Sequence, residues 1–400
     1  MRGRKYYVHK VLVTVVAAML LLTACSGART NSGTTAAAGD SDNKKPLEPV
    51  KIGAVFPMTG GSAYYGQGYK RGMDLAMEQI NKAGGVKNHP IELKVEDDKG
   101  TPVEGRNAAQ KLISQDQVLG LIGAYNSTVT LAIKELATAS KVVQLTPGST
   151  TDAITLQASP YMFRNININS TQCIAMADYV ADQLKLKKFV ILADNSDYGR
   201  DGATVFTKEF ASKGGQVLTT EYYKAGDKDF YALLTKVKSL NPEGVLISGY
   251  IAEGALIEKQ AKELKFAPQF VAFGAFTTDK FIELAGDAAE GMVHISNFEP
   301  SVQYFPEAKD FIAAFKAKYN NEDPDQYGAY GYEAIQLFAR AMELGGFTRE
   351  GLKDGMTKIK DVKTILGNVT FDQNGQAFRK LLIVKIQGGK RVPQAAGGAK

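Results

Sequence analysis

The chain has 400 residues, of which 44% are hydrophobic and 22% charged, a composition typical of a globular protein with two domains. Its formal net charge of +6 is concentrated at the N-terminus, where the first 24 residues carry four Lys or Arg and no acidic residue. The remainder has 44 basic and 42 acidic residues, without a basic tract interleaved with aromatics, so a nucleic-acid-binding protein is not expected.

The N-terminal segment predicts export. Its apolar stretch, Val11 to Leu22, is too short to span a bilayer as a permanent helix, so residues 1–24 are read as a signal peptide. The LTAC sequence ending at Cys25 resembles the lipobox of bacterial lipoproteins. That resemblance implies cleavage before Cys25 and acylation of its thiol, which anchors the protein to a membrane. The alternative is an ordinary secretory signal with a chance cysteine. Residues 26–49 lack periodicity and predict a flexible tether.

Strands and helices alternate from residue 50 onward, which predicts the α/β class. Predicted strands cover residues 51–56, 91–96, 119–122, 142–145, 161–164, 188–192, 215–221, 244–248, 269–274, 291–296, 368–371 and 378–386. Predicted helices cover residues 66–82, 103–115, 129–139, 171–184, a segment ending at 212, 230–240, 252–264, 306–319 and 328–344. The last two strands flank the turn 372–375.

Two hydroxyl-rich turns follow neighbouring strands in the first half. Asn126 and Ser127 follow one strand, and Gly148, Ser149 and Thr150 follow the next. A strand–helix–strand unit of this length makes a right-handed parallel crossover, so both turns lie at one carboxyl edge of the sheet. That edge is where open α/β sheets bind ligands, and helix N-termini there attract anions. We therefore expect a carboxylate site; helix capping alone is the alternative.

Two strands of the second half are followed by Tyr198 and Tyr250. If the carboxyl edges of two similar lobes face each other, these tyrosines lie opposite Ser127 and Thr150 across one cleft. Tyrosine has an apolar face and a hydroxyl, which suits closure over a small organic ligand. Tyrosine is also common at strand ends simply as a rim residue.

Several motifs together resemble a known family: KIGAVFPMTG, AYYGQGYKRGMDLAMEQINKAGGV, LIGAYNST, LTPGST, DYGRDGA and SGYIAEGA. The chain is similar, over about residues 50 to 390, to the periplasmic branched-chain amino-acid binding proteins of ABC importers, which have the type I periplasmic-binding fold. The resemblance implies two doubly wound α/β lobes joined by a three-strand hinge, with crossings near residues 166, 297 and 371. The lobes would comprise residues 50–166 with 298–371 and 167–297 with 372–392, followed by a tail, 393–400.

Matching positions imply a ligand site in the cleft. The carboxylate would be held by Ser127, Gly148, Ser149 and Thr150 through hydroxyl and backbone groups. Further ligand contacts are implied for Tyr65, Tyr125, Asn126, Tyr198, Tyr250, Phe276 and Tyr327. Packing is the alternative role for each of these residues.

The sequence departs from amino-acid-binding members at one position. Those members carry an acidic residue that pairs with the ligand's ammonium group, and the resemblance places Gly274 or a neighbour in the stretch FGAFTTDKF at that position. An unpaired ammonium in a closed cleft would cost several kcal/mol. Glu253 is the first candidate for an acid that could pair with the ammonium group instead, although it could also be a solvated charge at a helix start. Asp279 is a weaker candidate. Otherwise the ligand is a carboxylate, amide or aromatic acid without an α-amino group.

These features predict an exported, lipid-anchored receptor, acting as a monomer, that closes on an amino acid or related small carboxylate or amide and delivers it to an ABC permease. A ligand-sensing subunit of a signalling system is the alternative. We expect no cofactor, metal or enzymatic activity, because His9, His89 and His294 are not spaced with a second ligand or nucleophile. His294 is expected to be a satisfied core residue, and Cys173 a small buried one without a disulfide partner.

Overall fold

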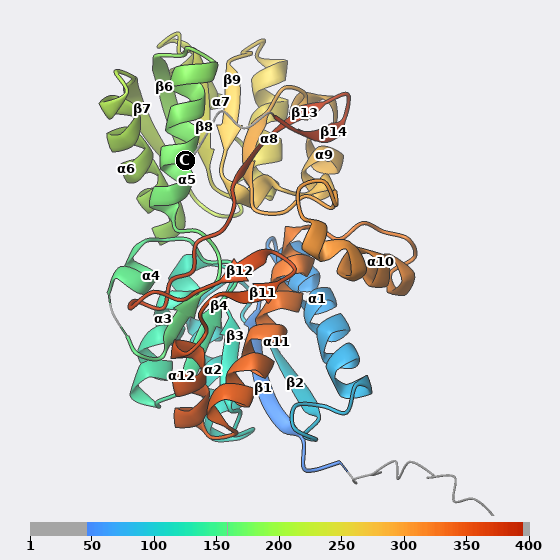
Figure 1. Ribbon diagram of the computed structural model, residues 1–400. Helices are drawn as coiled ribbons and strands as arrows, with labels where there is room; N and C mark the ends of the chain where they lie inside the picture. Colours follow the sequence, from blue (N-terminus) through green and yellow to red (C-terminus); the bar gives the residue numbers. More distant parts are fainter. Residues whose placement is uncertain (1–45, 158, 395–400) are drawn as a thin grey trace, which may run out of the picture. The chain divides into compact units, whose positions relative to one another are not determined.

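Two separate, mostly parallel β-sheets carry the fold, and helices cover both of them (Figure 1). The computed structural model describes residues 46–157 and 159–394, which belong to one compact unit. The predicted signal peptide, the predicted lipidation site Cys25 and most of the predicted tail lie outside the described residues. No helix within the described ranges combines the length and apolarity needed to cross a membrane.

The first sheet has five parallel strands in the order β2-β1-β3-β4-β5. The strands are β1 (Val50–Phe56), β2 (Ile91–Asp97), β3 (Gly120–Gly123), β4 (Val143–Thr146) and β5 (Met162–Arg164). Strands β3, β4 and β5 are buried throughout, as expected for a parallel sheet covered on both faces. The parallel pairing of β3 with β4 confirms the crossover that brings the two hydroxyl-rich turns to one edge.

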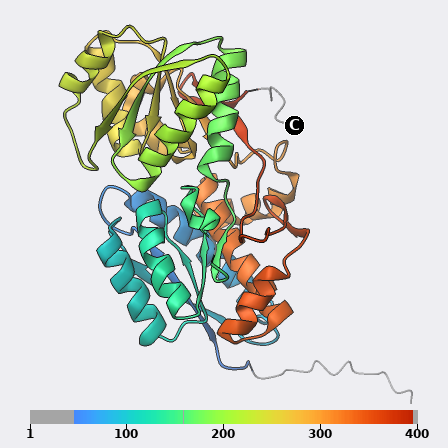
Figure 2. The ribbon, with the colours of Figure 1, turned by 90° about the vertical axis from the view of Figure 1, so that its left-hand side faces the viewer.

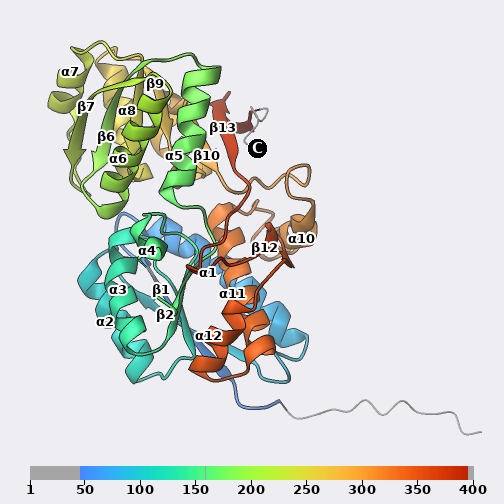
Figure 3. The same cartoon turned by 60° about the vertical axis from the view of Figure 1, so that its left-hand side comes forward.

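Helices from both ends of the chain cover this first sheet. They are α1 (Ala63–Lys82), α2 (Pro102–Ser114), α3 (Ser127–Ala139), α4 (Ala153–Leu156), α11 (Gln326–Gly345) and α12 (Arg349–Thr357), whereas α10 (Lys309–Lys318) packs against α1. Val55 and Leu121 pack in a cluster with residues of α2 and α3, whereas Ile52 and Phe56 belong to the larger core that includes α1 and α11. In Figure 3, α2 and α3 lie on one side of the first sheet, and α11 and α12 lie on the other side. Both sheet faces are therefore buried.

The second sheet has seven strands in the order β14-β13-β10-β9-β8-β6-β7. They are β6 (Lys188–Asp194), β7 (Gln216–Tyr223), β8 (Gly244–Ser248), β9 (Gln269–Ala272), β10 (Val293–Ser296), β13 (Leu382–Gln387) and β14 (Lys390–Pro393). Only the pairs that involve β13 are antiparallel. Its helices are α5 (Asn169–Asp178), continued by a π-helical turn, α6 (Asp197–Ser212), α7 (Tyr231–Lys238), α8 (Ile251–Glu263) and α9 (Asp279–Ala285). Figure 2 shows this second group of elements above the first.

The chain passes between the two sheets three times, over residues 165–168, 297–308 and 370–381. Two of these segments are tied to α11 through the buried Glu333 carboxylate. The Arg379 guanidinium donates to Glu333 at 2.6 Å, and the Asn165 amide donates to the same carboxylate oxygen at 2.7 Å. With two parallel-rich α/β sheets linked in this way, the predicted fold class is confirmed.

The prediction of a terminal strand pair around the turn 372–375 was wrong. Strand β12 (Gly367–Val369) pairs instead with β11 (Val362–Thr364), and β13 pairs with β10 and β14. The segment between β12 and β13 bonds to β5: Arg164 donates its N–H to Gly375, and Ala377 donates to Arg164. Hydrogen bonds to a strand distant in the sequence thus outweighed the local hairpin pattern.

Helix α1 begins at Ala63, three residues earlier than predicted, so Tyr64 and Tyr65 lie in its first turn. Glycine allows this helix to pack closely against α11. A Cβ atom at Gly72 would lie 1.9 Å from the Gly328 carbonyl oxygen, so only glycine fits there. The prediction also missed α4, α9, α12, β11 and β14, which are short.

Candidate functional site

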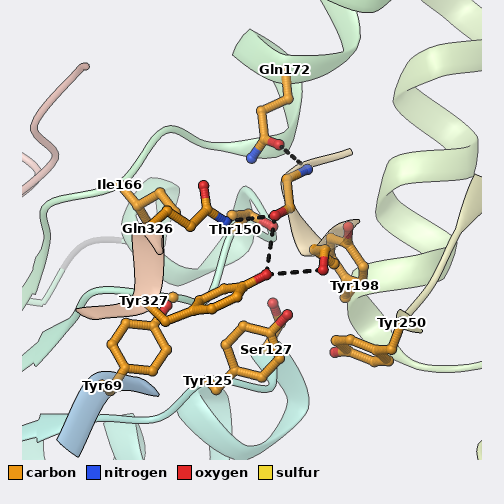
Figure 4. A pocket seen from close by; sticks show the side chains of 13 residues that line it. Tyr69, Tyr125, Ser127, Thr150, Ile166, Gln172, Tyr198, Tyr250, Gln326 and Tyr327 are labelled. Atoms are coloured by element: carbon orange, nitrogen blue, oxygen red, sulfur yellow. Dashed lines mark hydrogen bonds between the residues drawn. The ribbon is translucent and has the colours of Figure 1, made fainter. Parts of the chain in front are cut away.

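A small cavity lies where the carboxyl edges of the two sheets meet (Figure 4). Its free volume is about 20 Å³, which holds roughly one water molecule. Its walls are formed by Tyr69, Tyr125, Ser127, Gly148, Thr150, Ile166, Gln172, Tyr198, Tyr250, Gly274, Ala275, Gln326 and Tyr327. None of these thirteen lining residues carries a charge at neutral pH. The site is therefore a neutral, polar-edged cavity.

Hydroxyl groups from the first sheet form one end of the cavity. Ser127 is the first residue of α3, and its Oγ accepts a hydrogen bond from Thr151 N–H at 3.3 Å, which ties the two turns together. The Thr150 hydroxyl is buried and has no hydrogen-bond partner within the described residues. The Ser127 O–H, the Thr150 O–H and the positive end of the α3 dipole all suit a negatively charged group.

Ser149, between these groups, supports the turn. Its hydroxyl lies 2.7 Å from the Thr130 hydroxyl and within 3.0 Å of the carbonyl oxygens of Ala124 and Tyr125. The side chain is fully buried and does not line the cavity. Ser149 thus fixes the path of the turn from behind.

Five tyrosines contribute rings to the remaining wall, and Tyr65 packs behind Tyr125. Tyr65 stacks on Tyr125 with ring centroids 4.1 Å apart and meets Tyr327 edge-on at 5.1 Å. On the side of the second sheet, the rings of Tyr198 and Tyr250 lie 5.3 Å apart. Burial raises the pKa of Tyr65, Tyr125, Tyr198, Tyr250 and Tyr327, so their hydroxyls stay protonated and neutral.

Several hydrogen bonds connect the two sheets around the cavity. The Tyr65 hydroxyl accepts from Ile251 N–H at 3.0 Å, at the start of α8. The Tyr327 hydroxyl donates to the Ala275 carbonyl oxygen at 2.9 Å, and the Gln326 amide donates to the Gly274 carbonyl oxygen at 2.5 Å. The aromatic wall therefore contributes both packing and directional contacts between the sheets.

The end of the cavity opposite the hydroxyls carries amides instead of a carboxylate. Gly274 N–H donates to the Gln172 side-chain oxygen at 3.1 Å. A Cβ atom at Gly274 would lie 3.3 Å from that oxygen and 3.5 Å from Asn297 Oδ1. Neither polar atom of the buried Asn297 amide has a hydrogen-bond partner in the described part of the chain. This end offers neutral hydrogen-bonding groups only.

Comparison with known proteins places the chain in a family. The model of the family described as periplasmic binding protein matches residues 49–391. The Leu/Ile/Val-binding protein homolog 3 of Brucella melitensis is 31% identical over 335 residues, which cover 82% of this chain and 88% of the relative. The chain belongs to the periplasmic binding protein family. The family consists of binding proteins, which supports the prediction that this chain is not an enzyme.

Solved structures agree with this assignment. The branched-chain amino acid transporter substrate-binding protein LivJ of Streptococcus pneumoniae, in complex with isoleucine, has a TM-score of 0.81 and 30% identity, covering 86% of this chain and 99% of that one. A solute-binding protein of an ABC transporter from Rhodopseudomonas palustris, in complex with 3,4-dihydroxybenzoic acid, has a TM-score of 0.77 and 25% identity, covering 87% and 96%. Both match the type I periplasmic binding protein architecture.

In this binding protein the cavity brings together seven of the predicted ligand residues, namely Tyr125, Ser127, Gly148, Thr150, Tyr198, Tyr250 and Tyr327. Tyr65 lies directly behind Tyr125 in the aromatic stack. Asn126 is the buried N-cap of α3 but is not part of the cavity wall. Contact with a ligand remains a prediction for all of them.

Glu253 and Phe276 lie elsewhere. The Glu253 carboxylate is buried and accepts from Gly226 N–H at 2.7 Å, and burial raises its pKa. Phe276 packs edge-on against Phe281, with ring centroids 4.9 Å apart. Asp279 is largely exposed and pairs with Arg391. None of the three lines the cavity.

Five wall residues escaped the sequence reasoning: Tyr69, Ile166, Gln172, Ala275 and Gln326. Tyr69 follows Tyr65 by one helical turn, so the i, i+4 spacing could have revealed it. Ile166 and Gln172 belong to the first crossing and the helix after it, where the local pattern carries no ligand signal. Gln326 precedes the predicted Tyr327 and was identifiable only as its neighbour.

The expected core roles hold with one correction. Cys173 is a free, buried thiol. His294 is fully buried, and its Nδ1 lies 3.3 Å from the Thr277 hydroxyl, but Nε2 has no hydrogen-bond partner within the described ranges. The expectation of a satisfied histidine was therefore only half right. Among the described residues, no group of His, Cys, Asp or Glu could hold a metal.

Proposed function

We propose that the protein is the extracytoplasmic solute-binding component of an ABC importer and that its ligand is a small organic carboxylate. The observation that carries this proposal is the unpartnered, buried Thr150 hydroxyl beside Ser127 at the start of α3, in a cavity without charged walls. A ligand carboxylate supplies the acceptors that these groups lack. The name of the Streptococcus protein, a transporter substrate-binding protein, supports the transport role.

The ligand would be captured by closure of the two sheets about the three crossing segments. Ser127, Gly148 and Thr150 would bind from one side, and Tyr198 and Tyr250 from the other. Because only the closed form contacts the ligand from both sides, binding shifts the population toward it. The permease would then receive the closed, monomeric complex.

The wall near Gly274 favours a carboxylate without an α-ammonium group. No acidic residue lines the cavity, and the nearby Gln172 and Gln326 amides are neutral. An ammonium group enclosed there would lack an ionic partner, whereas the tyrosine rings suit an apolar or aromatic body. The relative that carries 3,4-dihydroxybenzoic acid is an example of such a ligand in this architecture.

The location proposed for the protein rests on the sequence. Cleavage before Cys25 and lipid attachment to its thiol would hold the binding protein at the outer surface of the cell membrane, with residues 26–49 as a tether. This arrangement keeps the receptor near its permease.

Thermal unfolding with candidate ligands tests the proposal, because selective binding raises the melting temperature. The probes are isoleucine, its keto acid 3-methyl-2-oxopentanoate, 3,4-dihydroxybenzoate and benzoate. We expect stabilisation by at least one acid without an ammonium group, and a Kd at least tenfold higher in Thr150→Val, since the lost hydrogen bond to a charged group contributes about 1.5–3 kcal/mol.

Thr138→Val is the matched control, because this hydroxyl lies on α3 and contacts Ser159 outside the cavity wall. Stabilisation by isoleucine alone would contradict the proposed ligand class. An unchanged Kd in folded Thr150→Val and Ser127→Ala would contradict the proposed site.

A further inference from the structure

Arg164, the last residue of β5, is a fully buried cation directly behind the Thr150 turn. Its Nη1 donates to the carbonyl oxygens of Ser149 at 3.2 Å and Thr151 at 2.7 Å. These two residues flank Thr150 on either side. The guanidinium therefore grips the backbone of the turn that carries the cavity's unpartnered hydroxyl.

The peptide bond between Ser149 and Thr150 is trans, so its C=O and N–H groups point in opposite directions. The carbonyl faces Arg164, and the Thr150 N–H is consequently turned away from the guanidinium. Thr150 N–H has no hydrogen-bond partner within the described residues. Arg164 thus orients a free backbone donor in a residue that lines the cavity.

The charge of Arg164 is not neutralised by direct contact. No carboxylate in the described part of the chain forms an ion pair with it, and its Nε donates to the neutral Gln376 side chain at 2.6 Å. Asp152, Asp201 and Asp372 act on it only from farther away. Burial lowers the pKa of Arg164 to about 9, which leaves it charged at neutral pH.

A second cation approaches the same segment. Lys134, on α3, donates through Nζ to the Gln157 carbonyl oxygen at 2.5 Å and lies 3.5 Å from that of Ala153. It also forms no direct ion pair with a described residue. Carbonyl groups of residues 149–157 thus face two cations. The positive potential of these cations, together with the N–H groups on the other side of the turn, attracts an anion to that side.

We propose that Arg164, assisted by Lys134, is the positioning residue that makes the cavity select anionic over neutral ligands. It orients Thr150 N–H and supplies the positive potential behind a wall that itself bears no charge. Because Gln376 belongs to the third crossing, Arg164 also links the ligand turn to a segment that joins the sheets. This inference rests on the proposed function, since it needs a carboxylate ligand at Thr150.

The test is the ratio of Kd values for matched acid and amide probes: benzoate with benzamide, and isoleucine with isoleucinamide. Arg164→Gln keeps hydrogen-bond donors but removes the charge. We expect its Kd for the bound carboxylate to rise at least tenfold and its Kd for the amide to change less than threefold. Arg164→Lys restores the charge and should keep the carboxylate Kd within threefold of wild type.

The control is Arg379→Gln combined with Glu333→Gln, which removes another buried arginine and its carboxylate partner from the crossings. We expect its acid-to-amide ratio to be unchanged. Equal losses for acid and amide in Arg164→Gln, or no rescue in Arg164→Lys, would overturn the inference because both indicate a purely structural role.

Lys134→Gln keeps the test decisive should Arg164→Gln fail to fold. Here we expect the acid-to-amide ratio to shift two- to threefold in the same direction, and an unchanged ratio would overturn the inference. A wild-type protein that binds neither carboxylate contradicts the proposed function first, and the inference with it. Carboxylate binding with unaltered ratios in the variants contradicts the inference alone.

Discussion

The Tyr65 hydroxyl oxygen lies 3.0 Å from the backbone nitrogen of Ile251, so a side chain of α1 accepts a hydrogen bond from the first residue of α8. The two helices cover different sheets. Ile251 N–H is one of the donors that a helix start leaves without an intrahelical partner. Tyr65 therefore supplies a cap across the cleft, and protein groups themselves contribute to its closure.

Replacing Tyr65 by phenylalanine removes this cap while keeping the aromatic stack on Tyr125. A hydrogen bond of this kind contributes about 0.5–1.5 kcal/mol, so we expect ligand Kd to rise roughly three- to tenfold. Small-angle X-ray scattering of the ligand-free variant should give a larger radius of gyration. Tyr319→Phe is the control, because that hydroxyl bonds to Arg71 without reaching the second sheet. Identical scattering and affinity in both variants would contradict a role for Tyr65 in closure.

Gly274→Asp should convert the neutral end of the cavity into an ammonium site. Gly274 does not have a positive φ, and the 3.3 Å approach of a Cβ to the Gln172 side chain requires only a small adjustment. We expect isoleucine to gain at least tenfold in affinity relative to its keto acid, since a hydrogen bond to a charged group contributes about 1.5–3 kcal/mol. Isothermal titration calorimetry measures both ligands. Gly274→Asn has the same shape without the charge, and an equal gain there would refute the electrostatic explanation.

Asp98 makes stability depend on pH. Its side chain is fully buried, one oxygen accepts from Gly100 N–H at 2.8 Å, and the other has no described partner. Burial raises its pKa to about 7, so the folded protein holds this proton more tightly than the unfolded chain, whose aspartate titrates near 4. The stability that the protonated form provides is therefore lost as the pH rises from about 4 through 7.

Asp98→Asn should consequently raise the free energy of unfolding by roughly 4 kcal/mol at pH 8 and change it little at pH 4. Urea denaturation at the two pH values measures the difference. Asp97→Asn is a control of opposite sign: although burial alone would raise the Asp97 pKa, hydrogen bonds from Thr59, Lys99 and Met58 lower it. That variant should lose stability at pH 8. An equal effect of Asp98→Asn at both pH values would refute the assignment.

Cys25→Ala tests the lipid anchor. Without the thiol there is no acylation site, so we expect the protein to move from the membrane fraction to the soluble fraction of cells, with ligand affinity unchanged. Cys173→Ala is the matched control, because this cysteine is buried far along the chain and should leave the protein with the membrane. Membrane retention of Cys25→Ala would mean that another feature anchors the protein.

The sequence predicted the parallel opening crossover and the wall residues Tyr198 and Tyr250 because both are marked locally, whereas Tyr125 and Tyr327 were expected only from the family resemblance. An apolar strand that runs into Ser127 or Thr150 is recognisable without tertiary information. No local sequence pattern identifies Gln172 and Ile166 as wall residues, because they reach the cavity only through the path of the first crossing segment and the helix that follows it. The position of Glu253 at a helix start suggested that its carboxylate could bind a ligand, but this carboxylate accepts a hydrogen bond from Gly226 N–H.

The sequence by itself determined the alternation of strands and helices and the two turns at one sheet edge, because periodicity and residue type act over a few residues. Only the tertiary structure decided which groups are free. The Ser149 hydroxyl is used by Thr130 and Ala124, whereas the Thr150 hydroxyl has no described partner. Arg164 came to lie behind that turn because β5 pairs with β4, and hydrogen bonding of buried polar groups depends on such distant neighbours.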